Sequence, residues 1–234
     1  MKTLGTAAAI AAVCAAPVMA ADFNGGSIEL EYSAFTEDSD VNRTTLRGQA
    51  ELGFTRNFAT QLDGGFYDYG YSGDGTNVVL HGIYHGSESA SFGAYVGRDE
   101  LEGLDGTLYG VEGGLVLTNT IIAEAYAGGM NSDGENVLML GVDLANSFGN
   151  GFSARAGFDY ASSEFVDVTK LDIGVNYSIA NQTNFYAELG SVSASGFGLS
   201  DNQTYVGAGI KIDFGARPGA TFGYRSLFDI LPGG

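Results

Sequence analysis

Two histidines are the side chains of this sequence best suited to acid–base or nucleophilic chemistry. His81 and His85 stand four positions apart, so on one strand they share a face at a separation of roughly 13 Å. One metal ion cannot bind both across that distance without a bulge. Ser91 offers a hydroxyl on the same face of the next predicted strand, but nucleophilic catalysis also needs an orienting group and an oxyanion site. Because no Gly-x-Ser-x-Gly turn occurs, we interpret the histidines as polar lining of an interior and predict no catalytic residue.

Two acidic segments carry oxygen ligands of the kind that hard cations bind. Residues 38–42 read Asp-Ser-Asp-Val-Asn, and residues 131–135 read Asn-Ser-Asp-Gly-Glu. Neither continues into a complete calcium-binding loop, so both are predicted to be solvated loops, with weak divalent bridging to lipopolysaccharide phosphates as the alternative. The sequence also has no glycine-rich phosphate loop and no cysteine cluster. We therefore expect no metal site and no cofactor.

The charge of the chain excludes one class of partner. The 234 residues include 10 Lys and Arg against 28 Asp and Glu, a net charge of −18. Phosphate backbones repel such an acidic chain, so nucleic-acid binding is excluded. The 15 Phe and 13 Tyr are not a disordered composition, because aromatic residues are scarce in disordered chains. A folded, acidic protein is predicted.

The first twenty residues have the pattern of a secretory signal peptide. Lys2 precedes an apolar run over 7–16 that is too short to span a bilayer, and a small-x-small exit ends at Ala20. We expect cleavage after Ala20 or Ala21. Cys14 would allow a lipoprotein as the alternative, but a valine precedes it where a small residue is required. If the segment is removed, the chain has no cysteine and no disulfide can stabilise it.

The rest of the chain repeats a strand pattern followed by a break rich in Gly, Asp, Asn and Ser. Residues 152–160 show the pattern most clearly, because apolar and polar residues alternate there with a period of two. Twelve such segments of about nine to eleven residues are predicted, the length with which a tilted strand crosses a bilayer. They cover residues 27–35, 44–54, 60–71, 77–85, 90–98, 107–117, 121–129, 137–145, 152–160, 168–177, 183–192 and 203–214.

The two faces of these predicted strands differ in charge. The central positions of one face are uncharged, as at Leu46, Leu52 and Leu140, and a Lys or Arg facing lipid at the midplane would cost about 2–4 kcal/mol. The other face is predicted to line a lumen. Its site residues are Glu31, Arg47, Glu51, Asp63, His81, Glu112, Glu124, Asp143, Arg155, Asp159, Lys170, Asp172, Glu188 and Lys211. A soluble β-sandwich is the alternative, and it would bury the apolar face instead.

Two further patterns favour a barrel in a membrane. Short breaks alternate with longer, acidic ones, as turns and loops do at the two ends of outer-membrane barrels. Aromatic residues gather at the strand ends, where interfacial belts form. They include Phe35, Phe54, Phe58, Tyr69, Tyr84, Phe152 and Tyr177. The predicted fold class is all-β, a closed antiparallel transmembrane β-barrel of about twelve strands.

The last predicted strand, over 203–214, alternates and ends on Phe214. It resembles the closing strand of bacterial outer-membrane barrels, whose terminal aromatic residue is the signal that the barrel-assembly machinery recognises. The chain up to Phe214 is similar to a small porin-family barrel, and with its tail it resembles small alphaproteobacterial porin-like proteins. The resemblance implies a location in the outer membrane of a Gram-negative bacterium. In such barrels the aromatic residue usually ends the chain. Here twenty residues follow Phe214, which departs from that pattern.

The sequence thus divides into a signal peptide (1–20), a transmembrane barrel (21–214) and a periplasmic tail (215–234). Pro218 lacks a backbone donor, which disfavours continued strand pairing. We expect the tail to fold back and cap the periplasmic mouth, with Arg225 or Arg217 against lumen acids and its apolar groups against the barrel rim. A loose tail is the alternative.

The favoured function is passive diffusion of small solutes through a narrow porin-like channel. Acids outnumber bases on the predicted lumen face, so a weak cation preference is expected. The expected partners are outer-membrane lipid and lipopolysaccharide, the barrel-assembly machinery and small solutes. A non-conducting structural or adhesion barrel is the alternative, and a lipid-modifying barrel enzyme is a third hypothesis; no enzymatic activity is predicted. The pattern identifies neither the solute nor the oligomeric state.

Overall fold

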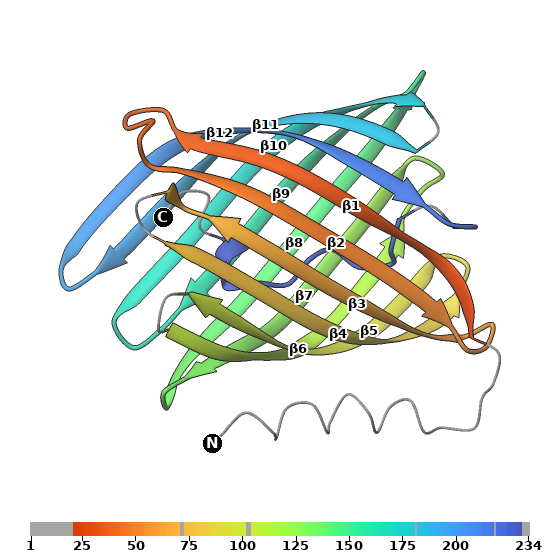
Figure 1. Cartoon of the computed structure of the whole chain (residues 1–234), viewed down its shortest axis with the longest axis horizontal. Helices are drawn as coiled ribbons and strands as arrows, with labels where there is room; N and C mark the ends of the chain where they lie inside the picture. Colours follow the sequence, from red (N-terminus) through yellow and green to blue (C-terminus); the bar gives the residue numbers. More distant parts are fainter. Residues whose placement is uncertain (1–20, 71–72, 102–103, 181, 218, 231–234) are drawn as a thin grey trace.

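The computed structural model describes residues 21–70, 73–101, 104–180, 182–217 and 219–230, in which the chain forms a barrel of twelve strands (Figure 1). The strands are β1 Asp22–Phe35, β2 Asn42–Gly53, β3 Phe58–Asp68, β4 Asp74–Ser87, β5 Ala90–Leu101, β6 Leu104–Val116, β7 Ile121–Ser132, β8 Glu135–Gly149, β9 Phe152–Ser162, β10 Val166–Ala180, β11 Thr183–Gly196 and β12 Leu199–Phe214. A short 3₁₀ helix, η2, spans Leu227–Asp229. Over the described ranges no helix has the length and apolarity to cross a bilayer. The predicted signal peptide, residues 1–20, lies outside the described residues.

The sheet closes on itself. Each strand pairs antiparallel with its neighbours in the chain, and β1 also pairs with β12, from Gly26 opposite Phe214 to Phe35 opposite Tyr205. Closure leaves no strand edge without hydrogen-bond partners, which is the condition for a sheet to lie in lipid. The predicted closed barrel of twelve antiparallel strands is confirmed.

The outer face of the barrel is apolar and exposed, whereas the inner face is polar and buried. Outward side chains such as Val78 and Ile173 are 55% and 62% exposed. Inward neighbours on the same strands, such as His81 and Asp172, are buried. A soluble sandwich would bury its apolar face, so this alternative is excluded. The exposed apolar band is the surface that a transmembrane barrel presents to lipid.

An aromatic girdle surrounds one end of the outer face, where β1 begins and β12 ends. Exposed rings from neighbouring strands pair there: Phe58 with Tyr84 at 5.2 Å between ring centroids, and Phe152 with Tyr177 at 4.6 Å. Phe214 stacks on Phe23 at 5.9 Å. These pairs fit the predicted interfacial belt.

The belt prediction was wrong for two residues, Phe35 and Tyr69. Both are buried inside the barrel. Phe35 packs with Tyr205 and its neighbours, and Tyr69 contacts the ring of Phe228 at 6.2 Å. Aromatic residues at a strand end can point to either face, and only the register of pairing decides which.

Most strands are longer and several loops are shorter than predicted. Strand lengths run from 11 to 16 residues, because polar residues assigned to loops continue the pairing. Two-residue turns replace the longer loops expected at 130–136 and 193–202. Asp133 and Gly134 have φ of 49° and 90°, and Phe197 and Gly198 have 53° and 78°, the positive values that tight hairpin turns need. The predicted alternation of short and long breaks is correspondingly weaker.

The face assignment predicts a large difference between two substitutions on β8. Val142 is 45% exposed on the outer face, so Val142→Arg should lower the free energy of unfolding in lipid vesicles by about 2–4 kcal/mol if it lies near the midplane. Ala145 borders the interior cavity described below, and Ala145→Arg should leave stability nearly unchanged. Urea unfolding followed by heat-modifiable gel mobility measures both. Equal losses would contradict the assignment of the faces.

Candidate functional site

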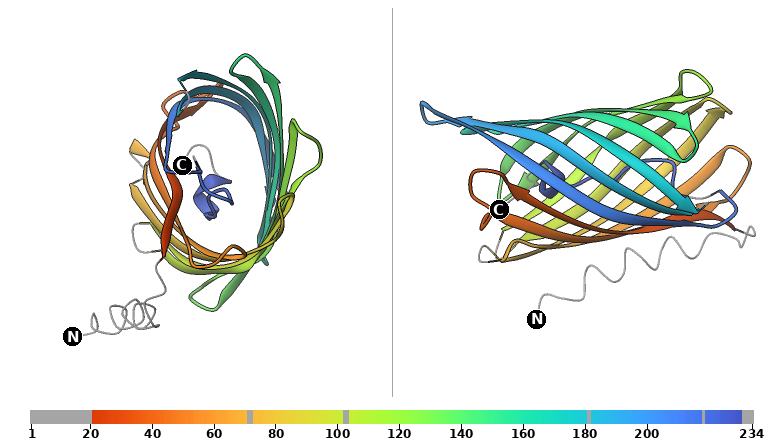
Figure 2. Two further views of the ribbon diagram at one scale, coloured as in Figure 1. Left: turned by 90° about the vertical axis from the view of Figure 1, so that its right-hand side faces the viewer. Right: turned by 90° about the horizontal axis from the view of Figure 1, so that it is seen from above.

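The C-terminal tail runs inside the barrel (Figure 2, left). Gly215 and Gly219, with φ of 101° and 92°, turn the chain inward after β12. The tail passes so close to Gly25 that a Cβ there would lie 1.9 Å from the carbonyl oxygen of Arg217. The sequence predicts that the apolar groups of the tail lie against the barrel rim. In the structure they are instead buried within the lumen. Phe222, Phe228 and Ile230 are each less than 7% exposed.

Apolar contacts on one half of the lumen hold the tail. Phe222 packs with Ala59 and Ile83, and its ring lies where a Cβ on Gly93 would come within 2.6 Å. Phe228 contacts the ring of Tyr67, with 5.1 Å between centroids. Glycine and small side chains on β3 to β5 thus leave the space that the aromatic rings of the tail fill.

Arg225 is the main charged contact of the tail. Its Nε donates to Glu112 Oε2 at 3.0 Å, and its Nη2 donates to Glu124. The guanidinium carbon also lies 4.5 Å from the ring centroid of Tyr126. Burial by itself would lower the pKa of Arg225, but the carboxylates of Glu124 and Glu112 outweigh burial and raise this pKa above its ordinary value. Arg225 therefore stays charged in the lumen.

His81 connects the ion pair of Arg225 and Glu112 to a third carboxylate, that of Asp63. Its Nδ1 lies 2.6 Å from Glu112 Oε1 and its Nε2 lies 3.1 Å from Asp63 Oδ2. All three side chains are buried. Both ring nitrogens are thus occupied, so His81 acts as a bridge between carboxylates on β3 and β6.

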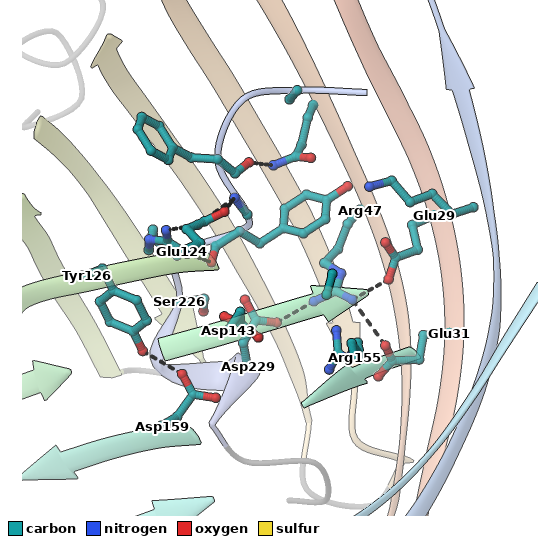
Figure 3. A pocket seen from close by; sticks show the side chains of 18 of the residues that line it. Glu29, Glu31, Arg47, Glu124, Tyr126, Asp143, Arg155, Asp159, Ser226 and Asp229 are labelled. Atoms are coloured by element: carbon teal, nitrogen blue, oxygen red, sulfur yellow. Dashed lines mark hydrogen bonds and ion pairs between the residues drawn. The ribbon is translucent and has the colours of Figure 1, made fainter. Parts of the chain in front are cut away.

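Arg47 forms a second cluster with acids from β1 and from the tail (Figure 3). Its Nη1 donates to Asp229 of η2 at 2.7 Å, and its Nη2 donates to Glu29 and Glu31. The same guanidinium lies 4.5 Å from the ring centroid of Tyr224. The cluster links the end of the tail to the wall of β1 and β2.

The opposite wall of the lumen carries ion pairs of its own. Arg155 donates to Asp172 at 2.9 Å and to Glu188 at 3.0 Å. Lys170 reaches the tail, where its Nζ donates to the carbonyl oxygen of Asp229 at 3.0 Å. Asp159 accepts a hydrogen bond from Tyr126 at 2.9 Å (Figure 3). Strands β9 to β11 therefore contribute both signs of charge.

A cavity of about 380 Å³ lies between the tail and this wall (Figure 3). One water molecule needs about 10–15 Å³ on the same measure, so the cavity has room for many. Its charged lining is nearly balanced, with seven acids against six bases. These residues are Glu29, Glu31, Glu124, Asp143, Asp159, Glu188 and Asp229, and Arg43, Arg47, Arg155, Lys170, Lys211 and Arg225.

The site residues expected from the sequence fall into three groups. Those in the cavity lining are Glu31, Arg47, Glu124, Asp143, Arg155, Asp159, Lys170, Glu188 and Lys211. Glu51 and Glu112 hydrogen-bond to the tail without lining the cavity. The third group contacts residues of the other two: His81 links Asp63 to Glu112, and Asp172 accepts a hydrogen bond from Arg155. The site residues expected from the sequence do not include several contact residues, namely Arg43, Gln49, Gln61, Asp99, Tyr126 and Tyr186. The alternation of inward and outward residues was the signal that could have identified them. The expected site residues were charged residues in the middle of strands, whereas these six are uncharged or lie at strand ends.

His85 and Ser91 do contact each other, but no carboxylate among the described residues orients His85 as a catalytic triad requires. His85 Nδ1 lies 2.9 Å from Ser91 Oγ. Its Nε2 has no hydrogen-bond partner in the described part of the chain, and the nearest carboxylate, Glu51, is 3.9 Å away. Glu51 instead accepts hydrogen bonds from Asn24 and from the backbone of Thr221. Within the described ranges, no group of three or more His, Cys, Asp or Glu side chains could hold a metal ion.

The fold is that of solved outer-membrane porins. A structure described as the KdgM porin in complex with disordered oligogalacturonate matches 80% of this chain and 99% of its own, with a TM-score of 0.62 and 14% identity. The NanC porin matches over 81% of this chain and 100% of its own, with a TM-score of 0.62 and 8% identity. No protein-family model and no curated protein matches the chain. At these identities the likeness concerns the fold, and this chain has the twelve-stranded architecture of outer-membrane porins.

Proposed function

We propose that this protein is an outer-membrane channel through which small solutes diffuse passively. The observation that carries the proposal is the water-accessible, charged cavity beside the tail, inside a barrel whose outer face is apolar. The fold shared with porins supports it. Phe214 would be the assembly signal, and lipid and lipopolysaccharide would surround the barrel. The resemblance to alphaproteobacterial proteins stays a prediction from the sequence.

A non-conducting structural barrel is the second candidate, because the tail occupies much of the lumen. Arg225, Phe222 and Phe228 are all buried there. Uptake of solutes by liposomes distinguishes a channel from a non-conducting barrel. Liposomes that contain the full-length protein should swell in isotonic solutions of small neutral or zwitterionic solutes and should swell more slowly as solute size increases. Liposomes with assembled protein that do not swell for any solute would favour the structural barrel. The lipid-modifying enzyme gains no support from the isolated His85–Ser91 pair.

A weak cation preference is the selectivity that we expect. The cavity lining has one more acidic than basic side chain. The net negative charge of the whole chain should also attract cations at low salt. The reversal potential in a KCl gradient should therefore have the sign of cation selectivity at low salt and approach zero at high salt, where screening is strong. Anion selectivity at low salt would contradict this prediction.

A further inference from the structure

The tail is bound mostly through its main chain. Four of its backbone N–H groups donate to side chains of the lumen: Thr221 to Glu51, Phe222 to Gln61, Gly223 to Glu124 and Leu227 to Asp99, at 2.8 to 3.1 Å. Four of its carbonyl groups accept from the lumen: Phe222 from Gln49 and Gln61, Arg225 from Asn77, Phe228 from Arg43 and Asp229 from Lys170. Such contacts recognise a peptide backbone in an irregular conformation that ends in the 3₁₀ turn of η2, whatever its sequence.

Side chains of the tail add selectivity to this recognition, among them Asp229, which binds Arg47. Phe222 and Phe228 fill separate apolar sites in the lumen, and Arg225 lies between the carboxylates of Glu112 and Glu124. Arg225 is 3% exposed. Two aromatic anchors around a buried arginine are the arrangement by which interfaces concentrate binding energy in few residues.

The covalent link to the barrel contributes little to these contacts. Residues 215–217 are exposed. Among the described tail residues, only Arg217 hydrogen-bonds to the barrel backbone, through its N–H to Asn24 O at 2.8 Å. The described residues of the tail therefore form no strand pairing with the barrel. Residues 215–217 therefore act as a linker: they raise the effective concentration of the tail near the lumen but add few contacts of their own.

We propose that the lumen wall formed by β1 to β7, together with Lys170 of β10, is a peptide-binding groove and that the tail is its ligand in cis. The ligand class is a short peptide that carries an arginine with one aromatic residue before it and one after it, and that can form a 3₁₀ turn at its end. When the tail is absent, such a peptide binds in trans at the same place. The proposal rests on the proposed channel function only in that a bound peptide narrows the pore.

Binding of a labelled peptide tests the groove directly. The barrel over residues 21–214, refolded in detergent, should bind a fluorescent synthetic peptide of residues 219–230 saturably by anisotropy. The full-length chain should not bind it, because its own tail occupies the groove. The Arg225→Ala peptide should bind at least about 30-fold more weakly, since a buried carboxylate pair then loses its partner. A Thr221→Ser peptide is the matched control, and it should bind normally because Thr221 uses its N–H.

The proposal is overturned if the barrel binds no peptide saturably or binds the Arg225→Ala peptide equally well. Should the truncated barrel not fold, a protease site inserted between Ala216 and Arg217 of the full chain allows the tail to be cut after assembly. Excess peptide should then displace the cut tail, and a cut tail that never exchanges would contradict the groove. Peptide binding without any conductance would refute only the channel, whereas conductance without peptide binding would refute only the groove.

Discussion

Removal of the tail after Phe214 is expected to raise single-channel conductance several-fold. The tail fills the half of the lumen next to β1 to β7, and its loss would join that space to the remaining cavity of about 380 Å³. The barrel should still assemble, because closure between β1 and β12 does not involve the tail. Truncation also leaves Phe214 as the last residue, as in the outer-membrane barrels that the closing strand resembles.

Planar-bilayer recordings of truncated and full-length protein, refolded side by side, measure this effect. Heat-modifiable gel mobility and β-sheet circular dichroism confirm that each preparation is assembled. Identical conductance of the two assembled proteins would mean that the tail does not restrict the pore.

Arg225→Ala is expected to release the tail from the lumen while the chain stays intact. The substitution leaves Glu112 and Glu124 without their cation, and breaking a buried ion pair from one side costs about 3–5 kcal/mol. This cost falls on docking of the tail, because the strands keep their own hydrogen bonds. The variant should therefore conduct like the truncated barrel, and its tail should become sensitive to protease.

Arg217→Ala is the matched control for this variant. Arg217 lies in the same tail, but it is exposed, and its backbone N–H makes the hydrogen bond to Asn24 of the barrel. Conductance and protease sensitivity should both stay at the level of the unmodified protein. If Arg225→Ala behaves like Arg217→Ala, the buried ion pair does not hold the tail.

The fold could be predicted from the sequence because a transmembrane barrel reverses the usual relation between polarity and burial. A period of two that leaves Leu46 and Val78 on one face and Asp63 and His81 on the other specifies both faces of each strand. Strand ends could not be predicted as well. Residues 193–196 are serine, alanine and glycine and were expected to form a loop, yet they pair in β11 with the beginning of β12. Pairing beyond the lipid needs no apolar residue and so leaves no hydropathy signal.

The candidate site was less predictable, because its contacts depend on closure and on the path of the tail. The sequence indicates that Arg225 carries a charge amid apolar neighbours and that Glu112 and Glu124 face inward. It does not indicate that β6 and β7 bring these two carboxylates to one arginine. Gln49 and Gln61 gave even less signal, since their role is to bind the backbone of Phe222. Such contacts depend on three-dimensional position and not on residue spacing.

Single-channel recording of the full-length protein in a planar bilayer tests the central claim most directly. The cavity beside the docked tail predicts small, discrete conductance steps for the intact chain and larger steps after the tail is removed. Absence of steps from assembled protein, both with the tail and without it, would contradict the proposal that the barrel is a channel.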